Sequence, residues 1–249
     1  MLILRSEKLS KEENIVFGLS TKIGQNPREP FYFNMSKSIG DDEKKVLNNR
    51  KLFLNKLNLT QENVVIQKQT HSAIVNIIDA PKQNLEGDAL ITSTPNIGLA
   101  VSTADCNNIY LYDKSKNVIA AVHSGWRGTE KKILKKTLIK LKESFNSESK
   151  DLIVFIGPSI SKKNYEVGTE VATNFDEKYT EQKGNSDKYL LDLQSGILDT
   201  LLEFGIPKSN IEKSSICSFQ NNKFQSYRRN GKNSGRALGV LALRPTNEL

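Results

Sequence analysis

Histidine and cysteine are scarce in this chain of 249 residues, which contains two of each. Several copper ions need many imidazole ligands, whereas two histidines and two cysteines supply at most one site with nitrogen and sulfur ligands. The scarcity therefore excludes multicopper oxidation. Two cysteines in a chain of this length also provide no framework of disulfide bonds.

Long apolar runs are lacking as well. No stretch approaches the roughly 18 to 20 apolar residues that cross a membrane as a helix. Only four residues, MLIL, precede the first charge at Arg5, and this is too short for the apolar part of a signal peptide. We expect a cytoplasmic protein that does not bind membranes.

The composition is that of a soluble globular protein, with 37% hydrophobic and 26% charged residues. Lysine and arginine number 36 and aspartate and glutamate 28, which gives a formal net charge of +8. A positive balance favours partners that carry phosphate, although net charge alone identifies none of them.

Short apolar runs rich in valine and isoleucine follow one another between about residues 63 and 156. Their length and the intervening Gly, Pro, Asn and Asp residues predict β-strands rather than buried helices. The predicted strands are NVVIQKQT, AIVNIID, DALITS, IGLAVST, NIYLYD, VIAAV and DLIVFIG.

Three segments have the apolar spacing of amphipathic helices: residues 130–145, 42–57 and 193–204. The lysines of the first segment are typical of a solvated helix face, so we expect no nucleic-acid partner. The polar residues 175–188 predict a loop or an insertion. Strands interleaved with helices predict a single mixed-sheet α/β domain over residues 1–249.

Three metal-binding residue types stand near the ends of predicted strands: His71, Cys106 and His123. Loops at strand ends converge in space even when they are distant in sequence. A thiolate with two imidazoles suits zinc and leaves one position for water or substrate, so these residues predict a catalytic zinc site. Cu(I) is the alternative occupant, because the same ligands suit copper.

Two other interpretations of these residues remain open. An isolated His or Cys is usually structural, and Cys is among the most buried residue types. Alternatively, Cys106 is the nucleophile of an amide hydrolase, with His123 or His71 as its base and Asp105 orienting the base.

An anion site is predicted directly after His123, where Ser124, Gly125 and Arg127 precede a helix. Glycine permits close approach of the backbone, the start of a helix presents free N–H groups, and arginine grips phosphate with two hydrogen bonds. The plainer alternative is a glycine-containing turn between a strand and a helix.

Two further groups are candidates for substrate contact or proton transfer. Arg228 and Arg229 lie before the apolar run GVLAL, which predicts that they stand at the start of a strand. There they bind phosphate or base or pair with surface carboxylates. Asp88 is a carboxylate among apolar neighbours, and so either a paired structural acid or a catalytic acid or base.

Seven segments in this order resemble the YfiH, or laccase-domain, family. They are FGLSTKIG with FYFNMS and IGDD, QKQTHS, GDALIT, STADC, AAVHSGWRGT, GPSI with YEVG, and SYRRNG with GRALGVLAL. The resemblance implies a mixed-sheet α/β sandwich related in shape to toxin-type cysteine hydrolases. It also implies one zinc ion held by His71, Cys106 and His123.

The resemblance further implies phosphorolysis of adenosine, inosine, guanosine and methylthioadenosine, and deamination of adenosine. In this interpretation Arg127 and Asp88 are catalytic, and Ser124, Gly125, Arg228, Arg229 and Asn34 bind the purine nucleoside and phosphate. Some bacterial members are instead described as peptidoglycan editing factors, and polyphenol oxidation with copper ranks last.

The chain departs from the family pattern at several positions. The family usually has arginine where Lys22 stands and an acid where Asn230 stands. It has apolar or proline residues in place of Asn107 and Asn108, and cysteines in place of residues 162–164. The metal ligands are retained, and we expect these departures to affect the choice of substrate.

Overall fold

Two β-sheets face each other at the centre of the protein, in a computed structural model that describes residues 1–25, 27–82 and 84–245. The larger sheet has six strands and the second has five. In spatial order, the larger sheet consists of β13 (Ile211–Lys213), β9 (Leu152–Ile156), β7 (Asn107–Asp113), β8 (Val118–Ser124), β5 (Ala89–Thr92) and β4 (Val75–Ile77). The second consists of β1 (Ile3–Leu4), β2 (Ile15–Ser20), β14 (Ala237–Leu243), β6 (Gly98–Thr103) and β3 (Val64–Ile66).

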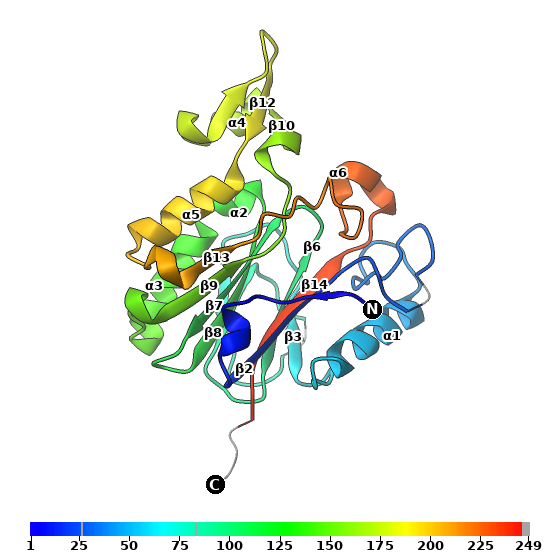
Figure 1. Ribbon diagram of the computed structural model, residues 1–249, viewed down its shortest axis with the longest axis vertical. Coiled ribbons are helices and arrows are strands. Elements are labelled where there is room, and N and C mark those ends of the chain that lie inside the picture. Colours follow the sequence, from blue (N-terminus) through cyan, green and yellow to red (C-terminus); the bar gives the residue numbers. More distant parts are fainter. Residues whose placement is uncertain (26, 83, 246–249) are drawn as a thin grey trace.

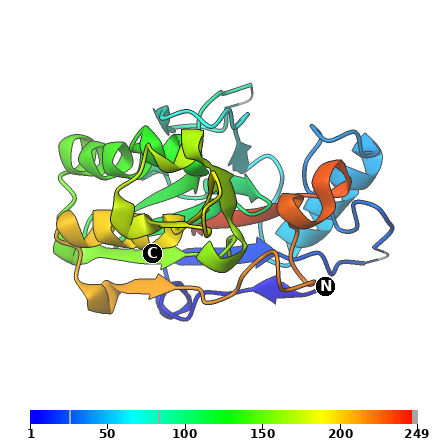
Figure 2. The ribbon, with the colours of Figure 1, turned by 90° about the horizontal axis from the view of Figure 1, so that it is seen from above.

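Helices cover the outer faces of both sheets and complete a four-layer sandwich (Figure 1). The helices α3 (Ile133–Phe145) and α5 (Leu193–Glu203) pack on the six-stranded sheet, and α1 (Glu43–Asn55) packs on the other. The view from above shows α3 and α1 on opposite sides of the two sheets (Figure 2). Both sheets contain parallel and antiparallel pairs, which confirms the predicted mixed-sheet α/β sandwich.

Alternation along the strands decides which side chains fill each layer. In β8, Ile119 and Ala121 belong to the core between the two sheets. Val118, Ala120 and Val122 belong to the core under α3 and α5. Successive side chains of a strand point to opposite faces, so the same alternation separates the next two residues, His123 and Ser124.

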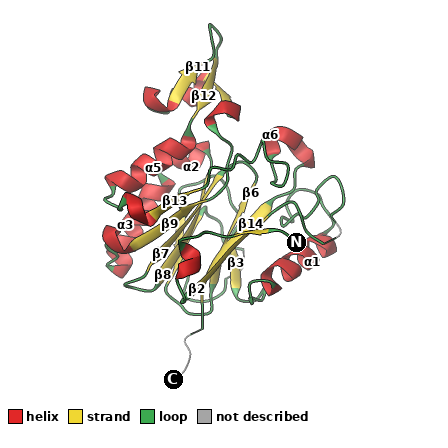
Figure 3. Ribbon diagram, in the orientation of Figure 1, coloured by secondary structure: helices red, strands yellow, loops and turns green. Residues whose placement is uncertain are grey.

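A small lobe projects beyond one end of the sandwich (Figure 3). It contains β10 (Glu166–Gly168), α4 (Thr169–Ala172), β11 (Thr180–Gln182) and β12 (Lys188–Leu191). The prediction of a loop at residues 175–188 was wrong, because β11 pairs with β12 there. The sequence of β11, TEQ, is short and polar and therefore lacks the apolar alternation that identifies a strand.

The remaining helices are short. Two are α-helical, α2 (Trp126–Glu130) and α6 (Tyr227–Asn230). The 3₁₀ turns are η1 (Leu9–Lys11), η2 (Ser149–Asp151), η3 (Lys162–Asn164), η4 (Glu177–Tyr179), η5 (Lys208–Asn210) and η6 (Gly231–Asn233). Within the described ranges, every helix is too short or too polar to cross a bilayer.

The three predicted helices exist with slightly different bounds. The side chains of Asp42 and Asp192 accept hydrogen bonds from the first turns of α1 and α5 and fix where these helices begin. The helix predicted from residue 130 instead begins at Ile133. Lys132 adopts the left-handed conformation, with a φ of 61°, and divides the segment into α2 and α3.

Candidate metal centre

His71, Cys106 and His123 come together, with Cys106 directly before β7 and His123 near the end of β8. Their ligand atoms all lie within 4.8 Å of one another. Cys106 Sγ is 3.9 Å from His71 Nε2, and the two imidazole rings meet edge to face with centroids 4.9 Å apart. The predicted convergence of these three side chains is confirmed.

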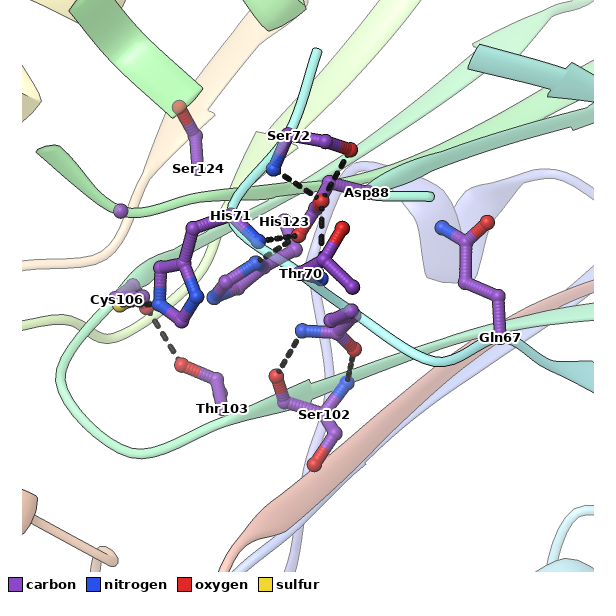
Figure 4. A network of polar contacts seen from close by, with 12 residues as sticks. Gln67, Thr70, His71, Ser72, Asp88, Ser102, Thr103, Cys106, His123 and Ser124 are labelled. Carbon is purple, nitrogen blue, oxygen red and sulfur yellow. Dashed lines mark hydrogen bonds and ion pairs between the residues drawn. The ribbon is translucent and has the colours of Figure 1, made fainter. Parts of the chain in front are cut away.

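Asp88 connects the elements that carry the two histidines (Figure 4). Its Oδ1 lies 2.8 Å from His123 Nδ1 and also accepts a hydrogen bond from the backbone N–H of His71. Its Oδ2 accepts hydrogen bonds from the N–H of Thr70 and from both the N–H and the hydroxyl of Ser72. Because Nδ1 of His123 is held by the carboxylate, Nε2 is the nitrogen left to bind a metal ion.

The carboxylate of Asp88 remains ionised in this position. Burial opposes its charge, but hydrogen bonds from His123 and Ser72 outweigh burial and lower its pKa to about 2. A fully buried acid with such a low pKa and with both oxygens occupied does not exchange protons with a substrate near neutral pH. Of the two predicted roles for Asp88, the geometry favours the paired structural acid, which positions both histidines.

The conformation of His71 depends on this carboxylate. Its φ of 56° lies in the left-handed region, which residues other than glycine adopt at a cost in free energy. Asp88 compensates that cost, because its carboxylate accepts hydrogen bonds from the backbone N–H groups of residues 70 to 72. His71 is therefore aimed at Cys106 by a loop that is folded around Asp88.

Cys106 stands immediately before β7, with its thiol between the two imidazoles. Burial raises the pKa of the thiol, but the charges and hydrogen bonds of His123 and His71 outweigh burial and lower it to about 6. The surroundings thus favour the thiolate, the form that ligates metal ions. Asp105 does not orient either histidine, because its carboxylate accepts hydrogen bonds from Ser218 Oγ and Arg228 N, both at 2.6 Å.

Gly125 leaves the space in which these ligands meet. A Cβ atom at this position would lie 2.9 Å from Cys106 Sγ and 3.0 Å from His71 Cδ2. Bonds of about 2.0 to 2.3 Å would join one zinc ion to ligands this close after small side-chain movements. The thiolate, the two imidazoles and the carboxylate behind one of them fit a single metal ion with nitrogen and sulfur ligands.

Ser124 lies on the opposite face of β8 from His123, as the alternation along the strand requires. Its hydroxyl is 2.8 Å from Thr129 Oγ1 and points away from His71 and Cys106 (Figure 4). The structure therefore does not support the prediction that Ser124 binds substrate at the metal centre. The sequence places the two residues side by side, but the strand separates them.

The predicted arginines divide into two groups. Arg127 and Arg228 are exposed, and their charges act on the half-buried Tyr165, as does that of Cys106. Arg229 instead donates hydrogen bonds to the carbonyls of Ser218, Phe219 and Phe224. These bonds hold the Arg229 guanidinium to the protein, and its predicted contact with substrate stays a prediction. The strand start predicted at Arg228 and Arg229 was wrong, because these residues lie in α6.

Asn34 also has a structural role in place of the predicted substrate contact. Its side chain is fully buried, and its amide nitrogen donates hydrogen bonds to the Ser36 carbonyl and to Asp41. Its amide oxygen accepts hydrogen bonds from the backbone N–H groups of Ser36 and Arg236. All its hydrogen-bonding capacity is used to hold the 34–41 loop to the start of β14.

Three more residues lie near the metal centre: Ser72, Tyr165 and Arg236. The sequence indicated no role for Ser72 or Tyr165, and it placed Arg236 only in a basic cluster with Arg228 and Arg229. The Ser72 hydroxyl donates a hydrogen bond to Asp88, and the charges of Cys106 and Asp105 act on the Arg236 guanidinium. Arg228 lies over the ring of Tyr165, with 5.2 Å between the guanidinium carbon and the ring centroid. Tyr165 was visible only as the first residue of YEVG, and nothing in its local pattern links it to a site 59 residues earlier.

The fold and the site together describe an α/β protein with one group of two imidazoles and a thiol that could hold a metal ion. The family model described as "Multi-copper polyphenol oxidoreductase laccase" matches residues 16–244, and the chain belongs to this family. The description refers to several copper ions, whereas the described residues contain one group of three His, Cys or acidic ligands, and both histidines belong to it.

Curated relatives that cover most of the chain are named as enzymes. A purine nucleoside phosphorylase of Bacteroides thetaiotaomicron is 35% identical over 259 residues, covering 97% of this chain and 96% of the relative. A purine nucleoside phosphorylase of Clostridium acetobutylicum is 42% identical over 184 residues, covering 70% of this chain and 74% of the relative. An adenosine deaminase from an unknown prokaryote is 31% identical over 257 residues, covering 96% of this chain and 98% of the relative.

Solved structures share the whole fold. The hypothetical protein YfiH of Bacillus licheniformis superposes with a TM-score of 0.90 at 27% identity, covering 97% of this chain and 96% of that one. YlmD of Geobacillus stearothermophilus gives a TM-score of 0.88 at 29% identity with the same coverage. These similarities confirm the resemblance to the YfiH family that the motifs indicated.

Replacing Asp88 with asparagine tests its positioning role. Asp88→Asn removes the charge that fixes His123 and the acceptors that fold the His71 loop. We expect metal affinity to fall by about 10- to 100-fold, measured by competition with a chromogenic chelator. Asp187→Asn, an exposed carboxylate in the small lobe, is the matched control. Unchanged affinity in a folded Asp88→Asn protein would contradict the role.

Two glycines, Gly125 directly before α2 and Gly128 within it, test the space around the ligands. Gly125→Ala places a methyl group against Cys106 and His71, so we expect metal affinity to fall by at least about tenfold. In Gly128→Ala the new Cβ lies 3.4 Å from its nearest neighbours, and metal content should not change. Elemental analysis of both proteins decides the matter. Equal, stoichiometric metal in the two variants would show that Gly125 is not required.

Proposed function

We propose that the protein is a zinc-dependent purine nucleoside phosphorylase that acts in the cytoplasm on adenosine, inosine, guanosine and methylthioadenosine. The observation that carries the proposal is the meeting of His71, Cys106 and His123. The exposed Arg127 and Arg228 lie nearby, since their charges and that of Cys106 all act on Tyr165. The names of the curated relatives support the choice of reaction. The substrates are a nucleoside and phosphate, without nucleic acid or membrane.

Zinc fits the donor set better than a hard cation, because a thiolate and two imidazoles are soft or borderline ligands. When bound, zinc supplies a Lewis-acidic centre with one position open to a substrate oxygen. Asp88 keeps His123 in the tautomer that binds through Nε2, and Gly125 leaves room for the ligands. Cu(I) is the alternative occupant of the same three ligands.

Phosphorolysis requires an anion to be held against C1' of the ribose. A phosphate oxygen forms a bond to C1' while the bond from C1' to the purine nitrogen breaks, and the purine leaves with a proton. Arg127 and Arg228 supply the positive charge that holds phosphate in place while charge spreads on the sugar ring. Burial raises the pKa of Tyr165, so its phenol keeps a proton and is available to donate a hydrogen bond.

Deamination of adenosine is the second proposed activity, and a relative named adenosine deaminase supports it. A third candidate is a cysteine hydrolase acting on amides, including those of peptidoglycan. The geometry that favours this candidate is Cys106 beside two imidazoles, of which His123 is held by Asp88. If metal-free protein still cleaves amides and loses this activity when Cys106 is alkylated, the result would support the hydrolase over the phosphorylase.

The decisive experiment incubates metal-analysed protein with inosine and phosphate. We expect hypoxanthine and ribose 1-phosphate in equal amounts, with about one metal ion per chain. Cys106→Ala should lose its metal, and its rate should fall at least about 100-fold. Cys217→Ala should keep the metal content and the rate of the wild type. Zinc-loaded protein that forms neither product would disprove the phosphorylase, and Cys106→Ala protein that retains its metal would disprove the ligand assignment.

A variant of Arg127 tests the phosphate site separately. Arg127→Ala removes charged hydrogen bonds to phosphate, so kcat/KM for phosphate should fall by about 10- to 100-fold. Metal content should stay the same. Lys142→Ala removes an equal charge from an exposed position on α3 and serves as the control. An unchanged kcat/KM in Arg127→Ala would exclude Arg127 from phosphate binding.

A further inference from the structure

A second cavity of about 350 Å³ lies on the other side of β8 and α2 from the metal centre. It is bounded by α3, α5 and the segment of the small lobe between α4 and β11. Ser124 and Thr129 line it, whereas none of the three metal ligands does. Because adjacent residues of β8 face opposite ways, His123 belongs to one site and Ser124 to the other.

The walls of this cavity combine aromatic rings with apolar side chains. Phe175, Tyr179 and Phe204 provide the rings, and the buried Leu193 and Ile197 of α5 provide aliphatic surface. The volume falls within the range of about 300 to 1,000 Å³ that is typical of pockets for small molecules. The cavity is thus large enough for an organic ligand that contains a ring.

The charges around the cavity are opposite in sign to those of the whole protein. Four carboxylates line it, those of Glu130, Asp176, Asp192 and Glu203, against two lysines. Among the described residues, none of these four carboxylates forms an ion pair. The formal charge of the lining is therefore negative in a chain whose net charge is +8. Asp192 and Asp176 accept backbone hydrogen bonds at the starts of α5 and η4, so Glu130 and Glu203 are the carboxylates left to attract an organic cation beside the aromatic faces.

Gly196 keeps part of the cavity open. It lies inside α5, where glycine is less favourable than alanine. Packing does not require a glycine there, because a Cβ atom would lie 3.6 Å from the ring of Tyr179, an ordinary contact. A larger side chain at this position would extend into the space that Tyr179 borders.

We propose that this cavity is a second binding site, separate from the metal centre, for a small organic amine that carries an aromatic or alicyclic ring. The ring packs against Phe175, Tyr179 and Phe204, and the ammonium group lies among the carboxylates. The site is independent of the proposed phosphorolysis, because the cavity contains neither the metal ligands nor Arg127.

Titration calorimetry with tryptamine tests the proposal, and indole-3-propionate provides a ligand with the same ring and the opposite charge. We expect tryptamine to bind the wild-type protein saturably, one molecule per chain, and the carboxylate to bind at least tenfold more weakly. Gly196→Leu fills the cavity and should weaken the binding of tryptamine at least tenfold. The double variant Glu130→Gln, Glu203→Gln removes two exposed charges and should weaken tryptamine binding at least threefold.

Matched measurements separate a filled cavity from a misfolded protein. Gly196→Ala should bind tryptamine within twofold of the wild type, and both Gly196 variants should retain their metal. No saturable binding of tryptamine, equal binding of indole-3-propionate, or unchanged binding in folded Gly196→Leu would each overturn the proposal. None of these results depends on whether inosine is cleaved.

Discussion

The candidate metal centre depends on one buried carboxylate. Asp88 accepts hydrogen bonds from three consecutive backbone N–H groups of the loop that carries His71, and it also holds Nδ1 of His123. It therefore sets the orientation of two ligands that come from different strands. A neutral residue of the same size would not satisfy so many donors at once, and a buried charge without these donors would be costly. The loop and the carboxylate stabilise each other.

The six-stranded sheet separates two chemical environments. On the side facing the second sheet, His123 joins His71 and Cys106. On the helix side, Ser124 and Thr129 border the cavity between α3 and α5. Gly125 and the five residues of α2 connect these sides, with Gly125 against the thiolate and Thr129 at the cavity. A change in the position of α2 would therefore affect both environments.

Arginine illustrates what local sequence leaves undecided. Arg228 and Arg229 are adjacent, and their sequence neighbourhoods are almost the same. In α6, however, Arg228 extends over Tyr165, whereas Arg229 binds three carbonyls of the 218–224 loop. Neighbouring residues of a helix point about 100° apart, so only the packing of α6 determines which side chain faces the metal centre. The hydrogen bond from the Arg236 N–H to Asn34 is likewise invisible in the sequence, because the two residues are 202 positions apart.

The sequence by itself determined the class of fold, most strands, the three main helices and the identity of the three side chains that form the candidate metal centre. These follow from periodic burial and from the scarcity of histidine and cysteine, which are local or compositional properties. Only the tertiary structure decided that Asp88 is a positioning residue, that Ser124 faces away from His123, and that Tyr165 and Arg236 lie near the thiolate. Such assignments depend on contacts between segments far apart in the chain, and no local pattern encodes them.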